Sequence, residues 1–145
     1  MSDCVGGVED RPLQVGDLLP VLVKPPITRT TLAYFCGASN DHNPVHVDID
    51  VAREMGMEDV FAHGMLSMAY VGQMLTGWIP QEYLRSFEVK FGAIVHLGDE
   101  LRCEGVIEEL FEREGEACVR IKLTVLNQNG NVKLTGEAVA ALPRT

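Results

Sequence analysis

The densest set of groups that could do chemistry is the segment Asp41-His42-Asn43-Pro44-Val45-His46-Val47-Asp48. Pro44 excludes a regular helix here, so Asp41 and His46 can meet only if the loop folds back on itself. A carboxylate and an imidazole held together in such a turn can bind one water between them, the carboxylate taking a proton and the imidazole giving or steering one. The side chain of Asn43 would lock the turn. A plainer interpretation remains open, in which Asp41 caps a turn and His46 is a hydrogen-bonded interior histidine.

A second candidate lies at Ala62-His63-Gly64-Met65, directly before a long apolar stretch. The first N–H groups of a helix have no internal partner and carry the positive end of the helix dipole. A helix that starts at Gly64 could therefore stabilise a thioester carbonyl that becomes enolate-like, and glycine lets a ligand approach the backbone closely. The alternative is that this is only a tight junction between a loop and a helix.

Three other patterns of reactive residues give weaker evidence for a functional site. His42 and His46 have the i, i+4 spacing of a metal pair, but Pro44 between them breaks the helix that the pattern needs, so no metal is expected. Ser67 lacks the GxSxG surround of a nucleophile. Cys36 has no obvious basic partner and is interpreted as a packing residue.

The elements that must position these groups begin with helices. Thr28 or Thr30 can cap a helix that ends before Asn40, and Asp48 or Asp50 can cap a short second helix that stops near Gly56. The segment from Gly64 to about Thr76 is apolar on every side, which predicts a helix buried all round.

Strands follow the helices. After Pro80 the apolar residues recur at every second position, as in Phe87, Val89 and Phe91, and the residues 127–130 form a hairpin turn before a last strand. Helices followed by antiparallel strands predict an α+β hot-dog fold, in which a curved sheet wraps around one buried helix. A sheet of about five strands leaves open edges, so a homodimer is expected.

Size and composition restrict the class of protein. The 145 residues predict one domain over residues 13–145, preceded by a loose leader over residues 1–12. The sequence has neither a membrane-spanning run nor a signal peptide, so we expect a cytoplasmic protein that does not bind membranes. The net charge of −9 argues against nucleic acid as a partner. The four scattered cysteines are expected to be free thiols.

Residues 35–48 resemble the motif of the MaoC-type hydratases, specifically the (R)-specific enoyl-CoA hydratases, with the aspartate, the Asn-Pro pair and the histidine in the family's positions. Asn40 stands where many members carry glycine or an acid. The resemblance spans nearly everything after Leu13, and it continues through residues 62–66, 86–95, 97–100 and 135–138.

The resemblance implies a hot-dog homodimer that reversibly hydrates a trans-2-enoyl-CoA to an (R)-3-hydroxyacyl-CoA, without metal or cofactor. In that scheme Asp41 and His46 activate the water, and the amide of Gly64 polarises the thioester carbonyl. Since coenzyme A is polyanionic, the acidic chain must gather local cations, for which the candidates are Arg85, Lys90 and Arg102.

The remaining substrate contacts expected from the sequence are Asn43, His63 and an apolar stripe on the central helix. Met68, Gly72 and Leu75 recur at helical intervals in that stripe and would face the acyl tail. The missing side chain at Gly72 would leave room for chains longer than four carbons, unless the sheet backbone fills the space.

Two rival functions are compatible with the same fold. A hot-dog thioesterase commonly carries its carboxylate on the central helix, but no Asp or Glu occurs between Asp59 and Glu82. A non-catalytic acyl-thioester-binding subunit of a heteromeric hydratase would need neither Asp41 nor His46. Both rivals therefore rank below the hydratase.

Overall fold

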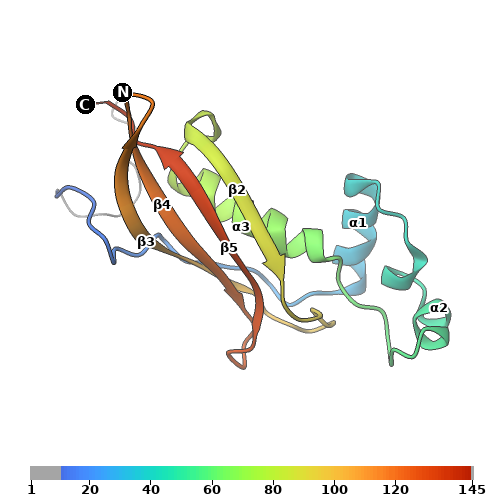
Figure 1. Cartoon of the computed structure of the whole chain (residues 1–145). Helices are drawn as coiled ribbons and strands as arrows, with labels where there is room; N and C mark the ends of the chain where they lie inside the picture. The colour runs from blue at the N-terminus through green and yellow to red at the C-terminus, as the bar shows by residue number, and fades with distance from the viewer. Residues whose placement is uncertain (1–10, 145) are drawn as a thin grey trace.

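The computed structural model describes residues 11–144, which form one antiparallel sheet, a long helix against it and a small helical layer at one end (Figure 1). The strands are ordered β1-β3-β4-β5-β2 across the sheet. This is the α+β hot-dog arrangement that the sequence predicts. The elements are β1 (Leu22–Val23), α1 (Arg29–Ser39), the 3-10 turn η1 (Pro44–His46), α2 (Ile49–Glu54), α3 (Gly64–Trp78), the 3-10 turn η2 (Gln81–Tyr83), β2 (Leu84–Phe91), β3 (Arg102–Arg113), β4 (Glu116–Leu126) and β5 (Val132–Ala141).

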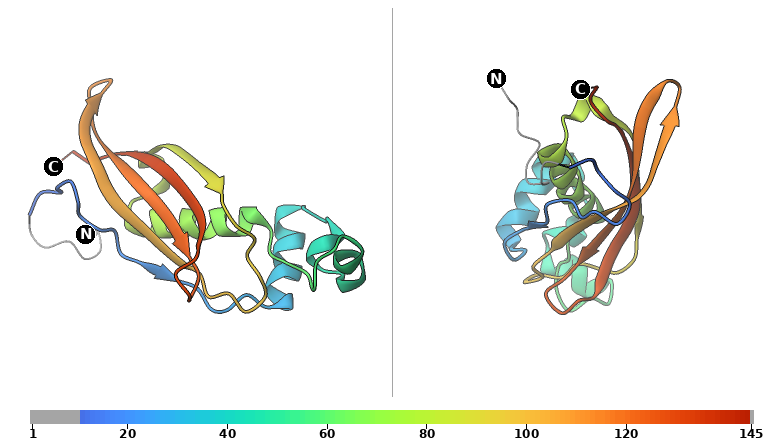
Figure 2. Two further views of the ribbon diagram at one scale, coloured as in Figure 1. Left: turned by 60° about the horizontal axis from the view of Figure 1, so that its bottom comes forward. Right: turned by 90° about the vertical axis from the view of Figure 1, so that its left-hand side faces the viewer.

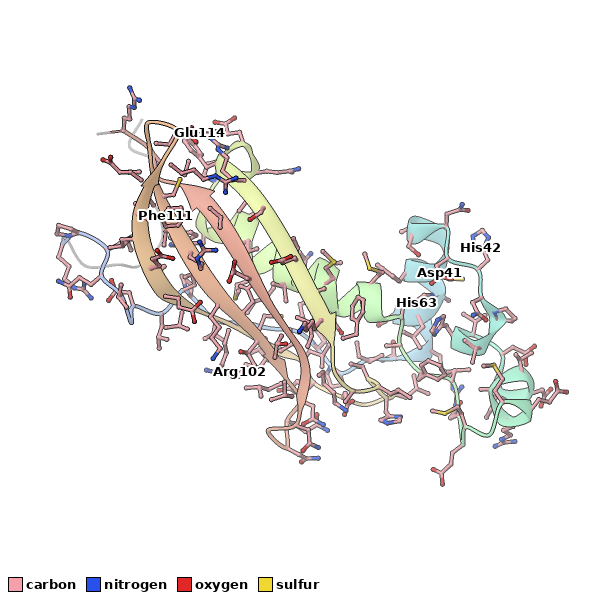
Figure 3. The ribbon with its side chains drawn as sticks, viewed as in Figure 1. Asp41, His42, His63, Arg102, Phe111 and Glu114 are labelled. Carbon is pink, nitrogen blue, oxygen red and sulfur yellow. The ribbon has the colours of Figure 1, made fainter. Side chains whose placement is uncertain are left out.

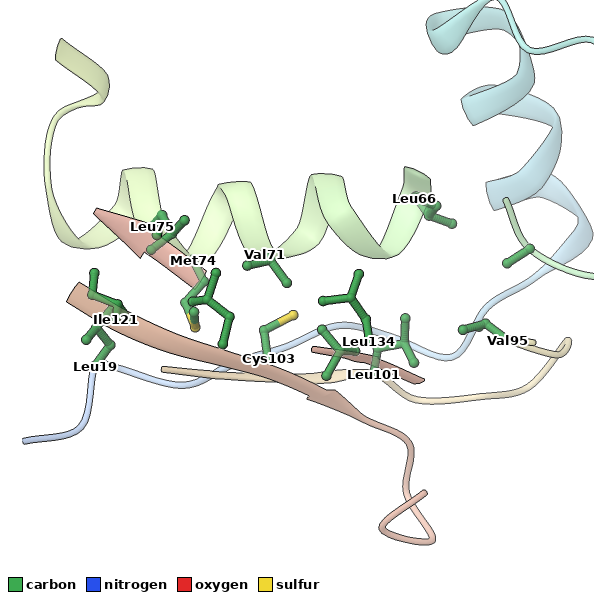
Figure 4. Packing of buried hydrophobic residues seen from close by; sticks show 14 of the residues in the cluster. Leu19, Leu66, Val71, Met74, Leu75, Val95, Leu101, Cys103, Ile121 and Leu134 are labelled. Atoms are coloured by element: carbon green, nitrogen blue, oxygen red, sulfur yellow. The ribbon is translucent and has the colours of Figure 1, made fainter. Parts of the chain in front are cut away.

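The inner face of the sheet forms half of the core. Side chains alternate across a strand, so Ile121, Leu123 and Val125 of β4 all point inward and are fully buried. They face α3, from which Val71 and Met74 project toward the sheet (Figure 4). Each such aliphatic side chain contributes about 1.5–3 kcal/mol by leaving water. The position of α3 is therefore set by the sheet beneath it.

The prediction that this helix is buried all round is wrong. One side of α3 is exposed along its length, with Met65 51% exposed and Ala69, Gln73 and Thr76 also at the surface. The physical reason is that the sheet of a single chain covers only one side of the helix. The helix also runs two residues further than expected, to Trp78.

The helices α1 and α2 form a layer beyond the N-terminal end of α3 (Figure 2). Thr28 caps α1 by accepting a hydrogen bond from the N–H of Thr31 at 3.1 Å, and Asp48 caps α2 in the same way through Asp50. Asn40 ends α1 with a φ of 60°, a left-handed conformation that asparagine tolerates better than most residues. These caps direct the connecting turn back toward the start of α3.

Within residues 11–144, every helix is too short or too polar to cross a bilayer. Of the expected leader, residues 1–10 lie outside the described part of the chain. Arg11 is described, and its guanidinium pairs with the carboxylate of Asp17 at 2.8 Å.

Candidate active site

The turn between α1 and α2 is held by side chains bonded to its own backbone. The Oδ1 atom of Asn43 accepts the N–H of Val45 at 3.2 Å, so Asn43 caps the turn η1 that Pro44 begins. The Oδ1 atom of Asp41 accepts the N–H of Asn43 at 3.3 Å. The other carboxylate oxygen of Asp41 has no partner among the described residues, and the side chain is exposed. The turn therefore presents one oxygen of Asp41 for a ligand.

His46 has its imidazole fixed from behind. The ring is only 8% exposed, and its Nδ1 lies 2.7 Å from the carbonyl oxygen of Phe61. A carbonyl can only accept, so Nδ1 must carry the proton of this bond. The remaining nitrogen, Nε2, is therefore the one that can exchange a proton with a ligand.

Asp41, His46 and His63 meet in one cluster. A carboxylate oxygen of Asp41 and one ring nitrogen from each histidine all lie within 4.8 Å of one another. One water can bridge such a gap, since two hydrogen bonds of about 2.8 Å span up to roughly 5.6 Å. The fold thus brings Asp41 and His46 together as the sequence predicts. Figure 3 shows Asp41 and His63 next to each other near the start of α3.

His63 lies beneath the other two residues. It is 1% exposed, its Nε2 donates to the backbone carbonyl of Asp41 at 3.3 Å, and Phe35 meets its ring edge to face. Burial, and then the charge of protonated His46, lower the pKa of His63 below its ordinary value of 6.5. His63 therefore stays neutral near pH 7 and supports the pair from within the protein.

The three residues offer the ligand types of a metal site, but their geometry does not fit one. The rings of His46 and His63 are stacked, with centroids 3.8 Å apart and planes inclined by 28°. A metal needs in-plane lone pairs that converge at about 2.0–2.1 Å from each nitrogen. Stacked, nearly parallel rings direct their lone pairs side by side instead.

The N-terminus of α3 lies next to this cluster. His63 is the N-cap but makes no side-chain capping bond, and the N–H groups of Gly64 and Met65 have no acceptor among the described residues. A Cβ atom at Gly64 would lie 3.0 Å from the ring of Phe91. Glycine therefore favours the close approach of the Phe91 ring, which covers an amide that has no acceptor of its own in the described part of the chain.

The expected acyl stripe follows along α3. Met68 and Gly72 are half-buried, whereas Leu75 is fully buried. A Cβ at Gly72 would have its nearest contact at 3.7 Å, with the ring of Phe87 on β2. The space above Gly72 is thus bounded by a side chain of the sheet and not by its backbone.

Cys36 supports the site in a way that its sequence context does not predict. The thiol of Cys36 donates to the carbonyl oxygen of Asp41 at 3.0 Å, the same oxygen that His63 contacts. The sequence predicts only a packing role for Cys36, because it offers the thiol no basic partner. The one feature of the sequence that indicates the contact is the spacing: Cys36 precedes Asp41 by five residues, and the helix that carries Cys36 ends between them.

Two of the cations expected at the mouth of the site are engaged elsewhere. Arg85 pairs with Glu116 at 2.7 Å, and Arg102 pairs with Glu104 at 2.7 Å. Lys90 lines a shallow hollow on the sheet together with Glu88 and Glu137. The guanidinium of Arg85 is fully engaged, whereas Arg102 uses only its Nε toward the described residues and keeps its terminal nitrogens for another partner.

The chain was compared with known proteins. The profile of the family described as "MaoC like domain" matches residues 19–129. The (R)-specific enoyl-CoA hydratase of Aeromonas caviae is 31% identical over 115 residues, which cover 77% of this chain and 84% of that protein. The mitochondrial 3-hydroxyacyl-[acyl-carrier-protein] dehydratase of Arabidopsis thaliana is 30% identical over 112 residues, 75% of this chain and 66% of that protein.

Among solved structures, the unliganded R-hydratase PhaJ1 from Pseudomonas aeruginosa matches with a TM-score of 0.80 and 30% identity. The match covers 92% of this chain and 84% of that one. The likeness thus extends from the motif around Asp41 and His46 to the whole fold. The chain belongs to the family of MaoC-like domain proteins.

Proposed function

We propose that the protein is an (R)-specific enoyl-CoA hydratase, which adds water reversibly to a trans-2-enoyl thioester and gives an (R)-3-hydroxyacyl product. The observation that carries the proposal is the cluster in which a carboxylate oxygen of Asp41 and a ring nitrogen of His46 lie within one water's reach. The relative from Aeromonas caviae, named for this activity, supports it.

The geometry supports a simple proton inventory for the reaction. As the water oxygen bonds to C3 of the enoyl chain, one water proton passes to the pair formed by Asp41 and His46. The pair returns a proton to C2 on the same side, so water adds syn and the pair regains its starting state. Negative charge develops meanwhile on the thioester oxygen, which the free N–H of Gly64 is placed to stabilise.

Other residues of the site position these groups. His63 and Cys36 both bond to the carbonyl of Asp41, and Asn43 caps the turn. We assign His63 and Asn43 this positioning role in place of the direct substrate contact expected from the sequence. Met68, Gly72 and Leu75 are assigned to the acyl side of the site.

The assembly we propose is a homodimer. β2 is an edge strand that pairs only with β5 among the described residues, and Phe91 at its end is 55% exposed beside Gly64. An open edge and an exposed ring next to the site favour pairing with a second copy.

A direct assay tests the function. Crotonyl-CoA incubated with the protein should lose the absorbance of its conjugated thioester, and the product should be the (R)-3-hydroxy enantiomer by chiral chromatography. Absence of turnover, or an (S) product, would contradict the proposal.

A second candidate substrate is the same acyl group on acyl carrier protein, because the Arabidopsis relative is named a 3-hydroxyacyl-[acyl-carrier-protein] dehydratase. Both carriers present the thioester on the same phosphopantetheine arm. Comparing kcat/KM for crotonyl groups on the two carriers separates them, and a strong preference for the carrier protein would favour this candidate.

A further inference from the structure

Ser67 is a buried hydroxyl that the proposed mechanism does not use. It lies in the second turn of α3, is 2% exposed, and its Oγ has no hydrogen-bond partner among the described residues. A buried hydroxyl without a partner costs about 1–3 kcal/mol, so most are paired in folded proteins. The unpaired hydroxyl therefore points to a partner that arrives with a ligand.

The surroundings of Ser67 define what that ligand is. Ser67 and Gly64 line a hollow of about 240 Å³, together with Phe91 and the loop that follows β2. Lys133 lines it too, but its ammonium is already paired: it donates to the carbonyl of Ile94 at 2.7 Å and lies 3.5 Å from the carboxylate of Asp99. Among the described residues around the hollow, none carries a carboxylate, although the whole chain has a net charge of −9. The hollow thus offers an acceptor oxygen the donors of Ser67 and Gly64, which are unpaired within residues 11–144, with no carboxylate in its described lining to repel that oxygen.

Helix geometry brings two donors to one side of this hollow. Ser67 follows Gly64 by three residues, and positions i and i+3 share a helix face. Gly64 offers a free backbone N–H at the positive end of the 15-residue helix α3, and Ser67 offers an O–H one turn later. A carbonyl oxygen has two lone pairs and can accept from both.

We propose that the Ser67 hydroxyl is the second hydrogen-bond donor to the thioester carbonyl, acting with the Gly64 amide. The inference rests on the proposed function, since it assigns Ser67 to the oxygen that becomes enolate-like during hydration. A donor in a dry site strengthens most when charge develops on its acceptor. Access requires the ring of Phe91, which lies against Gly64, to rotate, and its 55% exposure permits this.

A purely structural role for Ser67 makes a different prediction. His63 precedes Ser67 by four residues, and its buried Nδ1 also has no partner among the described residues. If the hydroxyl served that nitrogen, its removal would lower the stability of the fold and would not depend on a substrate carbonyl.

The test is the Ser67→Ala variant, with Thr76→Ala as the matched control. Thr76 lies on the same helix, is exposed, and bonds only to backbone carbonyls of its own turn. We expect Ser67→Ala to lower kcat for crotonyl-CoA about a hundredfold, the usual effect of losing one such donor. The melting temperature should stay the same or rise, and the control should keep normal turnover.

Binding of two unreactive ligands localises the effect to the carbonyl. Butyryl-CoA has the thioester oxygen, whereas S-butyl-CoA lacks it. Ser67→Ala should weaken the binding of butyryl-CoA up to about tenfold, the value of one hydrogen bond, and leave the affinity for S-butyl-CoA unchanged. A bound cinnamoyl thioester should also show a smaller shift of its absorbance to long wavelength in the variant.

Equal affinities of the variant and the wild type for butyryl-CoA would overturn the proposal, as would equal losses for both ligands or a lowered melting temperature with normal turnover. If the wild type fails to hydrate crotonyl-CoA, the proposed function fails. The binding comparison still decides the role of Ser67 in that case, because it requires no reaction.

Discussion

The imidazole of His63 stacks on the imidazole of His46 with ring centroids 3.8 Å apart, and it also bonds the backbone of Asp41. One buried side chain thus contacts both members of the proposed catalytic pair. A neutral ring in this place can stabilise a protonated His46 through its π face, whereas a charged ring would repel it. The neutrality of His63 therefore matters both to stability and to catalysis.

This neutrality predicts a loss of stability in mild acid. The pKa of His63 is lowered in the folded chain, and unfolding returns it to the ordinary value of 6.5. Below that value the unfolded chain binds more protons than the folded chain, so the free energy of unfolding falls as the pH drops through 6.5. His63→Gln should make this fall shallower, as measured by urea unfolding at several pH values. The same pH dependence of the free energy of unfolding in both proteins would contradict the claim that His63 is neutral in the folded chain.

The proposed pair predicts large and non-additive losses of turnover. Asp41→Asn or His46→Gln should each lower kcat by roughly a hundredfold to ten-thousandfold, and the double variant should lose little more, because both side chains serve one water. His42→Gln is the matched control, since His42 is exposed on the outside of the same turn. Circular dichroism should show intact folding. Near-normal rates in either single variant would exclude its assigned role.

The Gly72 position predicts a dependence on acyl chain length. Gly72→Leu fills the space below the ring of Phe87 and should depress activity on octenoyl-CoA far more than on crotonyl-CoA. Gly77→Leu is the control on the same helix, because a Cβ atom there meets nothing within 4 Å. Equal losses on both substrates with a reduced melting temperature would instead show a packing clash.

The described cysteines should differ sharply in reactivity. Burial raises the pKa of Cys103 to about 11, so its thiol is protonated at pH 8 and closed to reagents. Cys36 is half-buried and should be alkylated before Cys103 and Cys118. Its modification should lower turnover, since its thiol supports the carbonyl of Asp41. Peptide mapping by mass spectrometry follows the order, and early labelling of Cys103 would contradict it.

The open edge of β2 predicts the assembly. The purified protein should have about twice the 15.9 kDa mass of one chain in light scattering, and the dimer should persist at the concentration of the activity assay. A stable monomer with full activity would show that the exposed Phe91 and the free strand edge have another explanation.

The features of this fold that depend on neighbouring residues could be predicted from the sequence. The caps depend on contacts between residues that are close in the sequence, as at Thr28, Asn40 and Asp48. Residue type and spacing were therefore enough to predict the helix ends and the turn between them. The alternation in β4 likewise follows from a two-residue period. The motif around Asp41 and His46 could be recognised because both residues belong to one short turn.

What only the tertiary structure decided depends on contacts between distant segments. His63 stacks on His46 from 17 residues away, and the ring of Phe91 reaches Gly64 from the end of β2. One side of α3 is exposed because the sheet covers only part of the helix, and the hydrophobicity of the residues does not show how much of it the sheet covers. Periodicity shows which face of an element is apolar, but packing over the whole chain decides which element covers that face. For this reason only the tertiary structure shows that the hydroxyl of Ser67 is buried without a partner among the described residues.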